Sequence, residues 1–455
     1  MKFFIKTYGC QMNERDSEHV AQSFINRGYQ AAQCEEEADV ILLNTCSVRD
    51  AAEQKAIGKM GFMSRLQKKH PSLILGYFGC MAQSRGAELL KLSPHIHLVV
   101  GTQKAHRLAD YVHSLHTGTA AAPIVDVDSE VNSHCEIREH LDTLTPSAFI
   151  SIMQGCNMRC SYCIVPATRG AERSRPISEI VEEATKLAAR GTREITLLGQ
   201  IVNRYGLSRG TDTPSPFSHT PFVTLLHALS RIPGIERIRF TSPHPIGFGA
   251  DLVAAFSEIP QLAPHIHLPL QSGSDRILRA MRRGYTLAKF HTLVEKLRAT
   301  RPDMAFTTDI IVGFPGETDE DFQSTLRAIQ EIAFDNAYIF KYSPRTDTPA
   351  PALDSQVPEI VKEERNQILL AAINKIMQTK LDALVGTTQE VLAEGPSRTT
   401  NDRLAGRTLT NKIVVFDYPR TPDNTPSPLI GKIFPIRIVR ASTTTLYGEI
   451  AGSPR

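Results

Sequence analysis

Apolar runs alternate with segments of helical period through the first part of the chain. Four runs have the length and composition of buried strands: Phe3–Tyr8, Val40–Asn44, Leu73–Phe78 and Leu98–Val100. The segments between and after them carry apolar residues at helical spacing: Asp16–Gly28, Ala51–His70, Arg85–Leu92 and Ala105–His116. Strands that alternate with helices are typical of an open parallel sheet. The pattern therefore predicts an N-terminal open parallel α/β sheet domain over residues 1–116.

The alternation then pauses and resumes. Residues 117–146 are weakly periodic and begin with Thr-Gly-Thr-Ala-Ala-Ala-Pro, which predicts a linker. Six further strand-like runs follow: Phe149–Met153, Ile195–Leu198, Ile235–Phe240, Ile266–Leu270, Ala305–Val312 and Ala337–Tyr342. Six βα units predict a central partial (β/α)6 TIM-like barrel over residues 147–377, with its chemistry at the carboxyl ends of the strands.

The pattern changes to period two near the end of the chain, after a helical stretch at Pro358–Leu384. Four short runs alternate apolar and polar residues: Glu390–Ala393, Lys412–Phe416, Lys432–Val439 and Leu446–Ile450. Such runs, separated by turn residues, predict a small antiparallel β-barrel over residues 380–450.

The composition excludes some classes of protein but does not indicate a function. The chain has 455 residues, 41% hydrophobic and 22% charged, which is ordinary for a globular protein of several domains. It contains no apolar run of 18 residues, and its first residues lack the pattern of a signal peptide. We therefore expect a cytoplasmic protein without a membrane segment. Separately, we expect it to be a monomer.

Charge singles out the C-terminal barrel. The net charge of +3 is small, but residues 380–455 carry 10 Lys and Arg against 7 Asp and Glu. The basic residues on or beside the predicted strands are Arg403, Arg407, Lys412, Arg437 and Arg440. A small basic β-barrel could grip RNA, whereas a solvated charged face on a structural domain is the alternative.

Three of the eight cysteines, Cys156, Cys160 and Cys163, stand at C-x3-C-x2-C spacing directly after the first barrel strand. Three thiolates on one loop suit a cubane iron–sulfur cluster whose fourth iron stays open to a small molecule. A structural zinc site would need a fourth ligand, and His134 precedes the motif by 22 residues. Three buried thiols without a metal are the remaining alternative.

A second triad is spread along the N-terminal domain. Cys10, Cys46 and Cys80 each fall one or two residues beyond the end of a successive predicted strand. Because the carboxyl ends of such strands border one crevice, these thiols could meet as a second metal site. The alternative is that cysteine is merely a small residue tolerated at tight turns. Cys34 and Cys135 lack such a context and are predicted to be ordinary thiols.

The central loop resembles the radical S-adenosylmethionine (SAM) superfamily, whose C-x3-C-x-aromatic-C motif is matched with Tyr162 as the aromatic residue. The resemblance implies that the open iron chelates SAM and that the reduced cluster cleaves it to a 5′-deoxyadenosyl radical. Residues at the other strand ends then become candidates for SAM binding together with Tyr162: Gly199, Gln200, Ser242, Gln271 and Gly313. Of His265 and His267, at least one is expected to be a packed or surface residue.

From end to end the chain resembles the methylthiotransferases. The order of its parts implies an auxiliary 4Fe-4S cluster on the N-terminal triad, a radical SAM cluster on the central triad and a C-terminal TRAM RNA-binding domain. Three segments resemble the MiaB-type branch of that family, which acts on tRNA: Tyr8–Asn13, Gly79–Gln83 and Cys163–Gly170. The branches that modify threonylcarbamoyl-adenosine in tRNA or an aspartate of a ribosomal protein share the six cysteines and remain alternatives.

The resemblance implies methylthiolation of C2 of N6-isopentenyladenosine beside the anticodon, with two SAM molecules, two 4Fe-4S clusters and an electron donor such as flavodoxin or ferredoxin. The clusters carry the chemistry, so no catalytic side chain is assigned. Arg169, Arg173 and Gln271 are candidates for holding the target base. A non-enzymatic iron–sulfur or zinc RNA-binding protein is the competing class, and it predicts four protein ligands for each metal.

Overall fold

The computed structural model describes residues 1–47, 50–128, 145–207, 219–398, 402–418 and 429–455, and Cys135 lies outside these ranges. The chain divides into two compact units. The first comprises Met1–Thr143, Gln154–Arg159 and Cys163–Arg173, and the second comprises Leu144–Met153, Cys160–Tyr162 and Ser174–Arg455. None of the described helices is both long enough and apolar enough to span a membrane.

The first unit is built on a six-stranded sheet with the order β2-β1-β3-β4-β5-β6, and all its pairings are parallel. The strands are β1 Lys2–Tyr8, β2 Gln30–Ala31, β3 Val40–Thr45, β4 Ile74–Phe78, β5 Leu98–Val100 and β6 Ile124–Asp126. This is the open parallel sheet that the sequence predicts.

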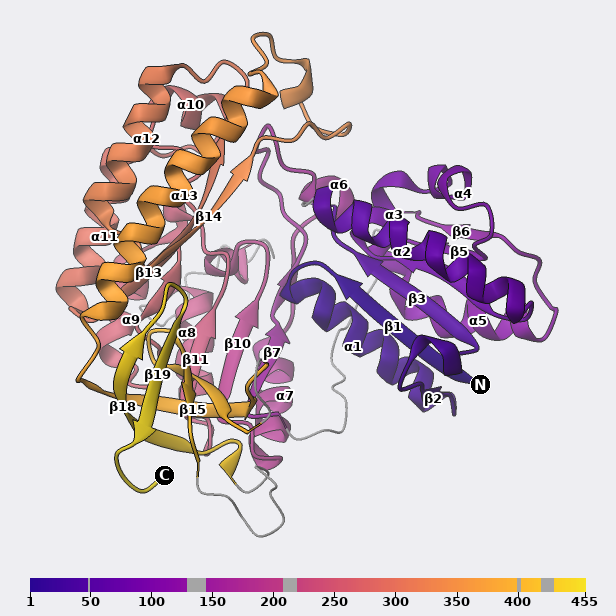
Figure 1. The fold of residues 1–455 in the computed structure, drawn as a ribbon, viewed down its shortest axis with the longest axis horizontal. Helices are drawn as coiled ribbons and strands as arrows, with labels where there is room; N and C mark the ends of the chain where they lie inside the picture. Colours follow the sequence, from indigo (N-terminus) through magenta and orange to yellow (C-terminus); the bar gives the residue numbers. More distant parts are fainter. Residues whose placement is uncertain (48–49, 129–144, 208–218, 399–401, 419–428) are drawn as a thin grey trace. The chain divides into compact units, whose positions relative to one another are not determined.

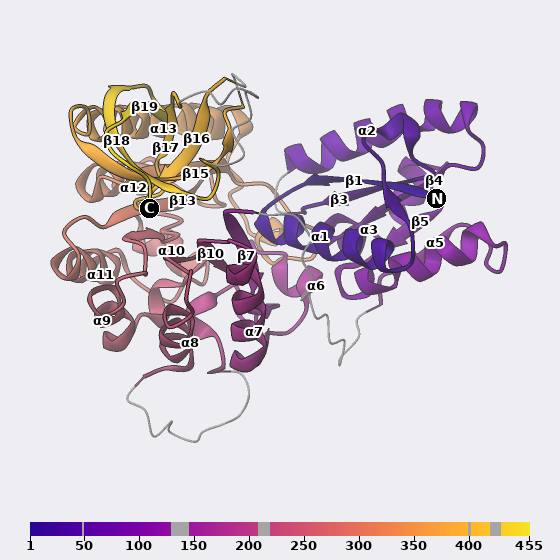
Figure 2. The same cartoon turned by 90° about the horizontal axis from the view of Figure 1, so that it is seen from below.

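Helices cover both faces of this sheet (Figures 1 and 2). They are α1 Gln11–Asn26, α2 Asp50–Lys69, α3 Cys80–Arg85, α4 Glu88–Leu92 and α5 Leu108–His116, with short 3-10 turns at Glu35–Glu37 and Thr102–Arg107. Phe24 of α1 and Val112 of α5 pack on one face, and Met60 of α2 and Leu89 of α4 pack on the other. Since alternate residues of each strand are buried on opposite faces, the strands show continuous apolar runs.

Several boundaries in the first unit differ from the sequence prediction. The predicted linker contains β6, which pairs with β5, so the sheet extends past residue 116. Its three residues are only partly buried or exposed, and so they give no apolar pattern. Helix α1 starts at Gln11 rather than Asp16, because its first turn is polar. The helix predicted at Arg85–Leu92 begins at Glu88, since Gly86 ends α3 with a positive φ.

The second unit contains the partial barrel. Its six parallel strands are β7 Ser147–Ser151, β10 Glu194–Leu198, β11 Arg237–Phe240, β12 His265–His267, β13 Ala305–Val312 and β14 Asn336–Lys341. They pair as two groups of three, β11-β10-β7 and β12-β13-β14. A single parallel bridge between Ile238 and Leu262 extends the pairing from β11 toward β12. The short strands β8 Met153–Gln154 and β9 Arg173–Ser174 pair separately.

Helices follow the barrel strands and lie along their outer side, where they close one apolar core (Figure 2). They are α7 Ile177–Ala189, α8 Pro221–Ser230, α9 Ala250–Glu258, α10 Asp275–Ala280, α11 Leu287–Thr300, α12 Asp319–Ile332 and α13 Glu359–Asp382. Short 3-10 turns lie at Val202–Arg204, Pro245–Gly247 and Ala350–Ala352, and α6 Val165–Arg169 belongs to the first unit. The loops at the carboxyl ends of the strands are thereby left to form a site.

The C-terminal segment forms a closed barrel with the order β15-β16-β17-β19-β18. Its strands are β15 Thr388–Pro396, β16 Leu404–Thr408, β17 Ile413–Phe416, β18 Ile433–Ala441 and β19 Thr445–Ile450. The sequence predicts four of these strands and misses β16. One pairing, β17 with β19, is parallel, so the barrel is not wholly antiparallel.

This small barrel docks on the partial barrel within the same unit. Arg237 donates to the carbonyl oxygens of Arg407 and Glu390 at 2.8 and 3.1 Å. Arg239 donates to those of Thr408 and Leu409 at 2.8 and 2.9 Å. Because Arg237 begins β11, the contact covers the amino-terminal ends of the strands and leaves their carboxyl ends to the candidate site.

Candidate metal centres at the strand ends

The three cysteines of the first unit meet beside one asparagine. Cys10 caps the start of α1, Cys46 follows β3, and Cys80 begins α3 after β4. The thiol of Cys10 donates to Asn13 Oδ1 at 3.3 Å, and Asn13 Nδ2 lies 4.0 Å from the sulfur of Cys80. Cys10 also shares a hydrogen bond with Cys46. The three thiols therefore lie near one another, and their role as metal ligands stays a prediction.

A buried amide network holds Asn13 in place. Asn13 Nδ2 donates to Asn44 Oδ1 at 2.9 Å, and Asn44 Nδ2 donates to Asn13 O at 2.8 Å and to Ser17 Oγ at 2.9 Å. Two glycines make room for it. A Cβ on Gly9 would lie 2.5 Å from Asn13 Oδ1, and a Cβ on Gly79 would lie 2.2 Å from Asn44 Oδ1. The short sequences around Cys10 and Cys80 thus serve the network as well as the turns.

An arginine brings positive charge to these thiols. Arg169 of α6, in the same unit, forms two hydrogen bonds to the Asp16 carboxylate, at 2.7 and 3.3 Å, and its side chain is only 5% exposed. A hydrogen bond with Cys46 lowers the pKa of Cys10 to about 5, burial opposes this shift, and the charge of Arg169 adds to it. Burial raises the pKa of Cys80, although Arg169 acts in the opposite direction.

This pairing changes the interpretation of Arg169. The sequence offers it as a residue that holds the target base, but its guanidinium is buried against Asp16 and serves the thiol site. The donor set fits an iron–sulfur cluster, because all three groups are thiols and the lowered pKa of Cys10 makes it easier to form the thiolate that binds iron.

The central cysteines lie on the loop between β8 and α6. Cys156 and Cys163 belong to the first unit and Cys160 to the second. The backbone amide of Met158 donates to the sulfur of Cys156 at 3.4 Å, and Arg283 Nη1 donates to the sulfur of Cys160 at 3.4 Å. Donors to sulfur stabilise thiolates, so each contact favours the thiolate form of its own cysteine.

Arg283 is itself held rigidly. It is 7% exposed, and its guanidinium carbon lies 5.5 Å from the centre of the Tyr285 ring. The Tyr285 hydroxyl donates to the carbonyl oxygens of Pro269 and Leu270 at 3.0 and 2.9 Å. A cation over an aromatic face in a buried site keeps its charge at low cost. This arrangement delivers a fixed positive charge to Cys160.

Tyr162, the aromatic residue of the motif, anchors the loop in the second unit. It packs, partly buried, against an apolar cluster that includes Met281 and Phe314. Its neighbour Ser161 donates from Oγ to the carbonyl oxygen of Ala280 at 2.7 Å. The position of Tyr162 is therefore explained by packing, and a contact with SAM remains a prediction.

The other predicted SAM-binding residues lie where four barrel strands end. Gly199 and Gln200 follow β10, Ser242 follows β11, Gln271 lies beyond β12, and Gly313 follows β13. Ser242 and Gln271 have positive φ values of 56° and 69°, which are rare for residues with a side chain and cluster at functional sites. The sequence alone gives no sign of this backbone conformation.

Buried polar atoms without a partner mark the same strand ends. Gln200 Oε1 and Gln271 Oε1 are buried and accept no hydrogen bond from the described residues. His244, after β11, accepts from the amide of Ile246 at Nδ1, so its proton lies on Nε2, and this buried donor also has no partner. Burial lowers the pKa of His244 to about 3, helped by the charges of Arg283 and Arg204, so the ring stays neutral. Such atoms fit a polar ligand like SAM.

The two predicted glycines have a different explanation. A Cβ on Gly199 would lie 2.5 Å from Met153 Cγ, and a Cβ on Gly313 would lie 2.3 Å from Lys362 Cγ. Close packing against neighbouring side chains therefore accounts for glycine at both positions. Their expected contact with SAM stays a prediction.

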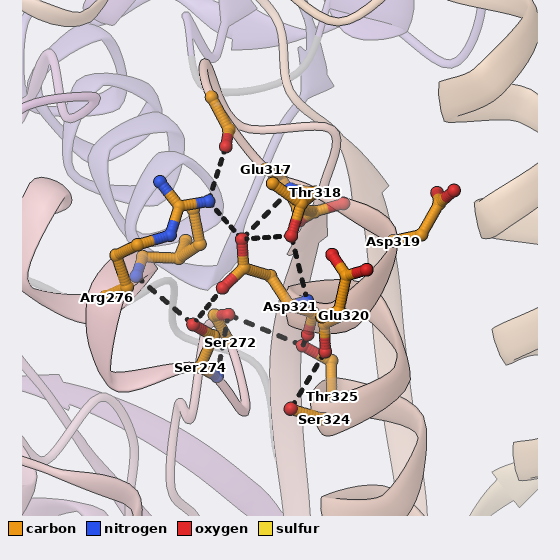
Figure 3. Close-up of polar contacts among 12 residues, drawn as sticks. Ser272, Ser274, Arg276, Glu317, Thr318, Asp319, Glu320, Asp321, Ser324 and Thr325 are labelled. Atoms are coloured by element: carbon orange, nitrogen blue, oxygen red, sulfur yellow. Dashed lines mark hydrogen bonds and ion pairs between the residues drawn. The ribbon is translucent and has the colours of Figure 1, made fainter.

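A polar network fixes the loops after β12 and β13 (Figure 3). Ser274 Oγ donates to Asp321 Oδ1 at 2.5 Å, the Thr318 amide donates to Asp321 Oδ2 at 2.9 Å, and Arg276 forms an ion pair with Asp321. Burial raises the pKa of Asp321, but the hydrogen bonds from Arg276, Ser274 and Thr318 outweigh it and hold the pKa at about 2. The starts of α10 and α12 are thereby tied together beside Gln271.

Comparisons with known proteins agree with this architecture. Uncharacterized protein family UPF0004 matches residues 2–101, the Radical SAM superfamily matches residues 150–329, and the TRAM domain matches residues 382–451. Among solved structures, the radical S-adenosylmethionine methyltransferase TsrM from Kitasatospora setae has a TM-score of 0.56 at 13% identity, covering 82% of this chain and 89% of its own. At that identity the likeness concerns the fold.

Curated relatives match the chain over its length. A tRNA-2-methylthio-N(6)-dimethylallyladenosine synthase of Akkermansia muciniphila is 52% identical and covers 98% of both chains. The synthase of the same name from Opitutus terrae is 50% identical and covers 98% of this chain and 96% of its own. The barrel and its cysteine loop are those of a radical SAM enzyme. With these full-length relatives, the chain belongs to the radical SAM methylthiotransferase family.

Proposed function

We propose that this enzyme methylthiolates C2 of N6-isopentenyladenosine next to the anticodon of tRNA. Relatives that match 98% of the chain are named as synthases of that methylthiolated nucleoside in tRNA. The structural observation that carries the proposal is the convergence of Cys10, Cys46 and Cys80 at one end of the N-terminal sheet, in addition to the cysteine loop of the barrel. A radical SAM enzyme that only cleaved SAM would not need this second thiol site.

Each thiol site has its own supporting side chains. When bound, two 4Fe-4S clusters and two SAM molecules would supply the electron, the radical, the methyl group and the transferred sulfur. Cys156, Cys160 and Cys163 would hold one cluster, with Arg283 stabilising the Cys160 thiolate. The N-terminal triad would hold the other, with Asn13 donating toward Cys80.

The barrel residues would orient SAM and the base. Gln200 and Gln271 offer buried carbonyl oxygens that could accept from amino groups of SAM, and His244 offers a buried N–H. An adenine must leave the anticodon stack to reach such a site, at a cost of about a few kcal/mol. A single-stranded loop allows this more readily than a duplex does.

The C-terminal barrel would hold the tRNA. Its strand β18 exposes Arg437 and Arg440, and Arg440 lies over the ring of Tyr447 at 3.7 Å. A basic, aromatic strand face is the kind of surface that binds single-stranded RNA. We propose that the enzyme works as a monomer and takes its electron from a flavodoxin- or ferredoxin-type donor.

The test separates the two thiol sites. In the reconstituted enzyme, Cys160→Ala should abolish 5′-deoxyadenosine and modified tRNA together, because SAM is cleaved at the barrel cluster. Cys46→Ala should keep 5′-deoxyadenosine formation and lose only the methylthiolated nucleoside. Cys34→Ala, a partly buried thiol outside both triads, is the control and should behave as wild type. Nucleoside mass spectrometry and iron content, about eight irons per wild-type chain, measure these outcomes.

Three results would contradict the proposal in different ways. Sulfur insertion by Cys46→Ala over many turnovers would remove the N-terminal triad from the reaction. A methylthio group on threonylcarbamoyl-adenosine or on a ribosomal-protein aspartate would move the enzyme to another branch of its family. Stoichiometric zinc without labile sulfide would favour a non-enzymatic RNA-binding protein.

A further inference from the structure

Two histidines and a glutamate converge on the outer side of the partial barrel. His219 lies two residues before α8, His227 lies in the last turn of α8, and Glu258 is the last residue of α9. One ligand atom of each side chain lies within 4.8 Å of the other two. The two imidazole rings are 5.1 Å apart between centres, and His227 Nε2 is 3.7 Å from Glu258 Oε2. None of these residues belongs to the thiol sites or to the strand ends.

One nitrogen of each histidine in this cluster lacks a hydrogen bond. His219 Nδ1 and His227 Nε2 are buried and have no partner among the described residues. Burying a polar nitrogen without a hydrogen-bond partner destabilises the fold, so these two atoms call for an explanation. The separation of 3.7 Å between His227 and Glu258 is too long for a hydrogen bond. It is close to the spacing of about 3.4 Å between ligands around a tetrahedral ion with bonds of about 2.0–2.1 Å.

We propose that His219, His227 and Glu258 bind a divalent transition-metal ion, zinc by the chemistry of the donors. Two imidazole nitrogens and one carboxylate oxygen are ligands that zinc takes readily, whereas magnesium and calcium prefer oxygen donors alone. Three protein ligands leave the fourth position to water. The bound ion would fasten residue 219 to the ends of both α8 and α9. This site does not depend on the tRNA reaction proposed above.

The chain offers a matched control in another histidine and glutamate. His291 Nε2 lies 3.7 Å from Glu331 Oε2, the same distance as in the proposed site. The exposed fractions are also similar, 28% and 62% against 27% and 47%. Within the described residues, no third ligand completes the His291 pair. Two ligands alone hold zinc weakly, so this pair should leave zinc binding unchanged when it is disrupted.

The experiment uses the full-length enzyme with its iron–sulfur clusters loaded. The protein is equilibrated with ZnCl2 and desalted, then its zinc and iron are counted and the zinc X-ray absorption edge is recorded. Wild type should keep about one zinc per chain at an unchanged iron content, with nitrogen and oxygen neighbours at about 2.0–2.1 Å. A sulfur shell at about 2.3 Å would mean that zinc occupies cysteines, and the proposal would fall.

Variants locate the ion. His227→Ala and Glu258→Gln should each reduce the retained zinc from about one per chain to near zero, whereas His291→Ala should keep it. Added zinc should raise the thermal unfolding midpoint of wild type and of His291→Ala, and should leave that of His227→Ala unchanged. Glu258→Gln guards against a folding defect, because it alters a half-exposed carboxylate with almost no change of shape. Equal zinc content in wild type, His227→Ala and Glu258→Gln would overturn the site.

Discussion

Single residues around the thiols come from distant parts of the sequence. Arg283 reaches Cys160 across 123 positions, and Arg169 reaches Asp16 across 153. The cysteines themselves could be predicted, because their spacing and their places after strands follow from local patterns. Their partners could not, because the residues next to an arginine in the sequence give no sign of the sulfur or carboxylate that it will meet. The sequence therefore predicts the ligands of both sites and misses the charges that stabilise them.

The sequence pattern around His265 does not decide the role of this residue. Its surroundings in the structure predict how the stability of the protein changes with pH. His265 is partly buried at the start of β12, with Arg239, His267, Asp335 and Lys412 nearby. Burial lowers its pKa well below the ordinary value of 6.5, and Arg239 lowers it further. The folded protein thus leaves His265 neutral while the unfolded chain takes up a proton below about pH 6.5. The contribution of His265 to the free energy of unfolding is therefore fully present above that pH and is lost as the pH falls.

The expected slope is up to about 1.4 kcal/mol per pH unit below about pH 6.5. His265→Gln should remove that slope from the unfolding free energy, measured by urea titration at several pH values. His70→Gln, which alters an exposed histidine, should leave the wild-type profile. Parallel profiles for wild type and His265→Gln would show that His265 keeps its ordinary pKa.

Strands, like single residues, could be predicted where the local sequence determines them and could not where contacts with distant residues do. Strands β3 and β13 could be predicted because each is a long run of apolar and β-branched residues. Strand β16 could not, because Gly406 and Arg407 interrupt its pattern. Gly406 is required by a neighbour that the sequence does not reveal, since a Cβ there would lie 2.1 Å from the carbonyl oxygen of Leu392. β16 is a strand because it pairs with β15, and not because of its own composition.

The close contact between the loop after β12 and helix α12 predicts the effect of a substitution at Gly273. A Cβ on Gly273 would lie 2.5 Å from the carbonyl oxygen of Ser324 and 2.6 Å from the Cα of Thr325, both in α12. Since backbone atoms cannot move aside, Gly273→Ala should cost about 1–3 kcal/mol and shift the loop that carries Gln271. Thermal unfolding and equilibrium dialysis with SAM should show lower stability and weaker SAM binding.

The control for this change lies in α2. Gly61 has open space around its Cα, so Gly61→Ala should stabilise the helix by up to about 1 kcal/mol and leave SAM binding unaltered. If Gly273→Ala bound SAM as tightly as wild type, the loop after β12 would not form part of the SAM pocket.

At the scale of the molecule, the C-terminal barrel has a structural task beside any contact with RNA. Arg237 and Arg239 are 1% and 5% exposed, and their partners in that barrel are backbone carbonyls. Lys412, a candidate for RNA contact in the sequence, instead pairs with Asp335 at 3.0 Å. Deleting the barrel would therefore uncover two buried charges and destabilise the rest of the unit. RNA binding is better tested by substitutions on the surface of the barrel.

The basic residues of the barrel can be divided by their partners. Arg403 pairs with Asp417 at 3.0 Å and Arg407 with Glu394 at 3.4 Å, whereas Arg437 and Arg440 form no ion pair within the part of the chain that the structure describes. Arginines that are not neutralised by a carboxylate attract phosphate most strongly. We therefore expect Arg437 and Arg440 to contribute most to the affinity for tRNA.

The double change Arg437→Ala and Arg440→Ala should weaken tRNA binding and reduce the slope of log affinity against log salt by roughly one for each phosphate that an arginine no longer neutralises. Reductive cleavage of SAM without tRNA should stay at the wild-type rate, because the change leaves the docking contacts of Arg237 and Arg239 in place. Arg403→Ala is the matched control, since it removes an arginine that a carboxylate already neutralises, and it should alter the slope little. Filter binding across a range of salt concentrations measures all three proteins. An unchanged slope in the double variant would make β18 a solvated charged face and would leave the C-terminal barrel with its docking task alone.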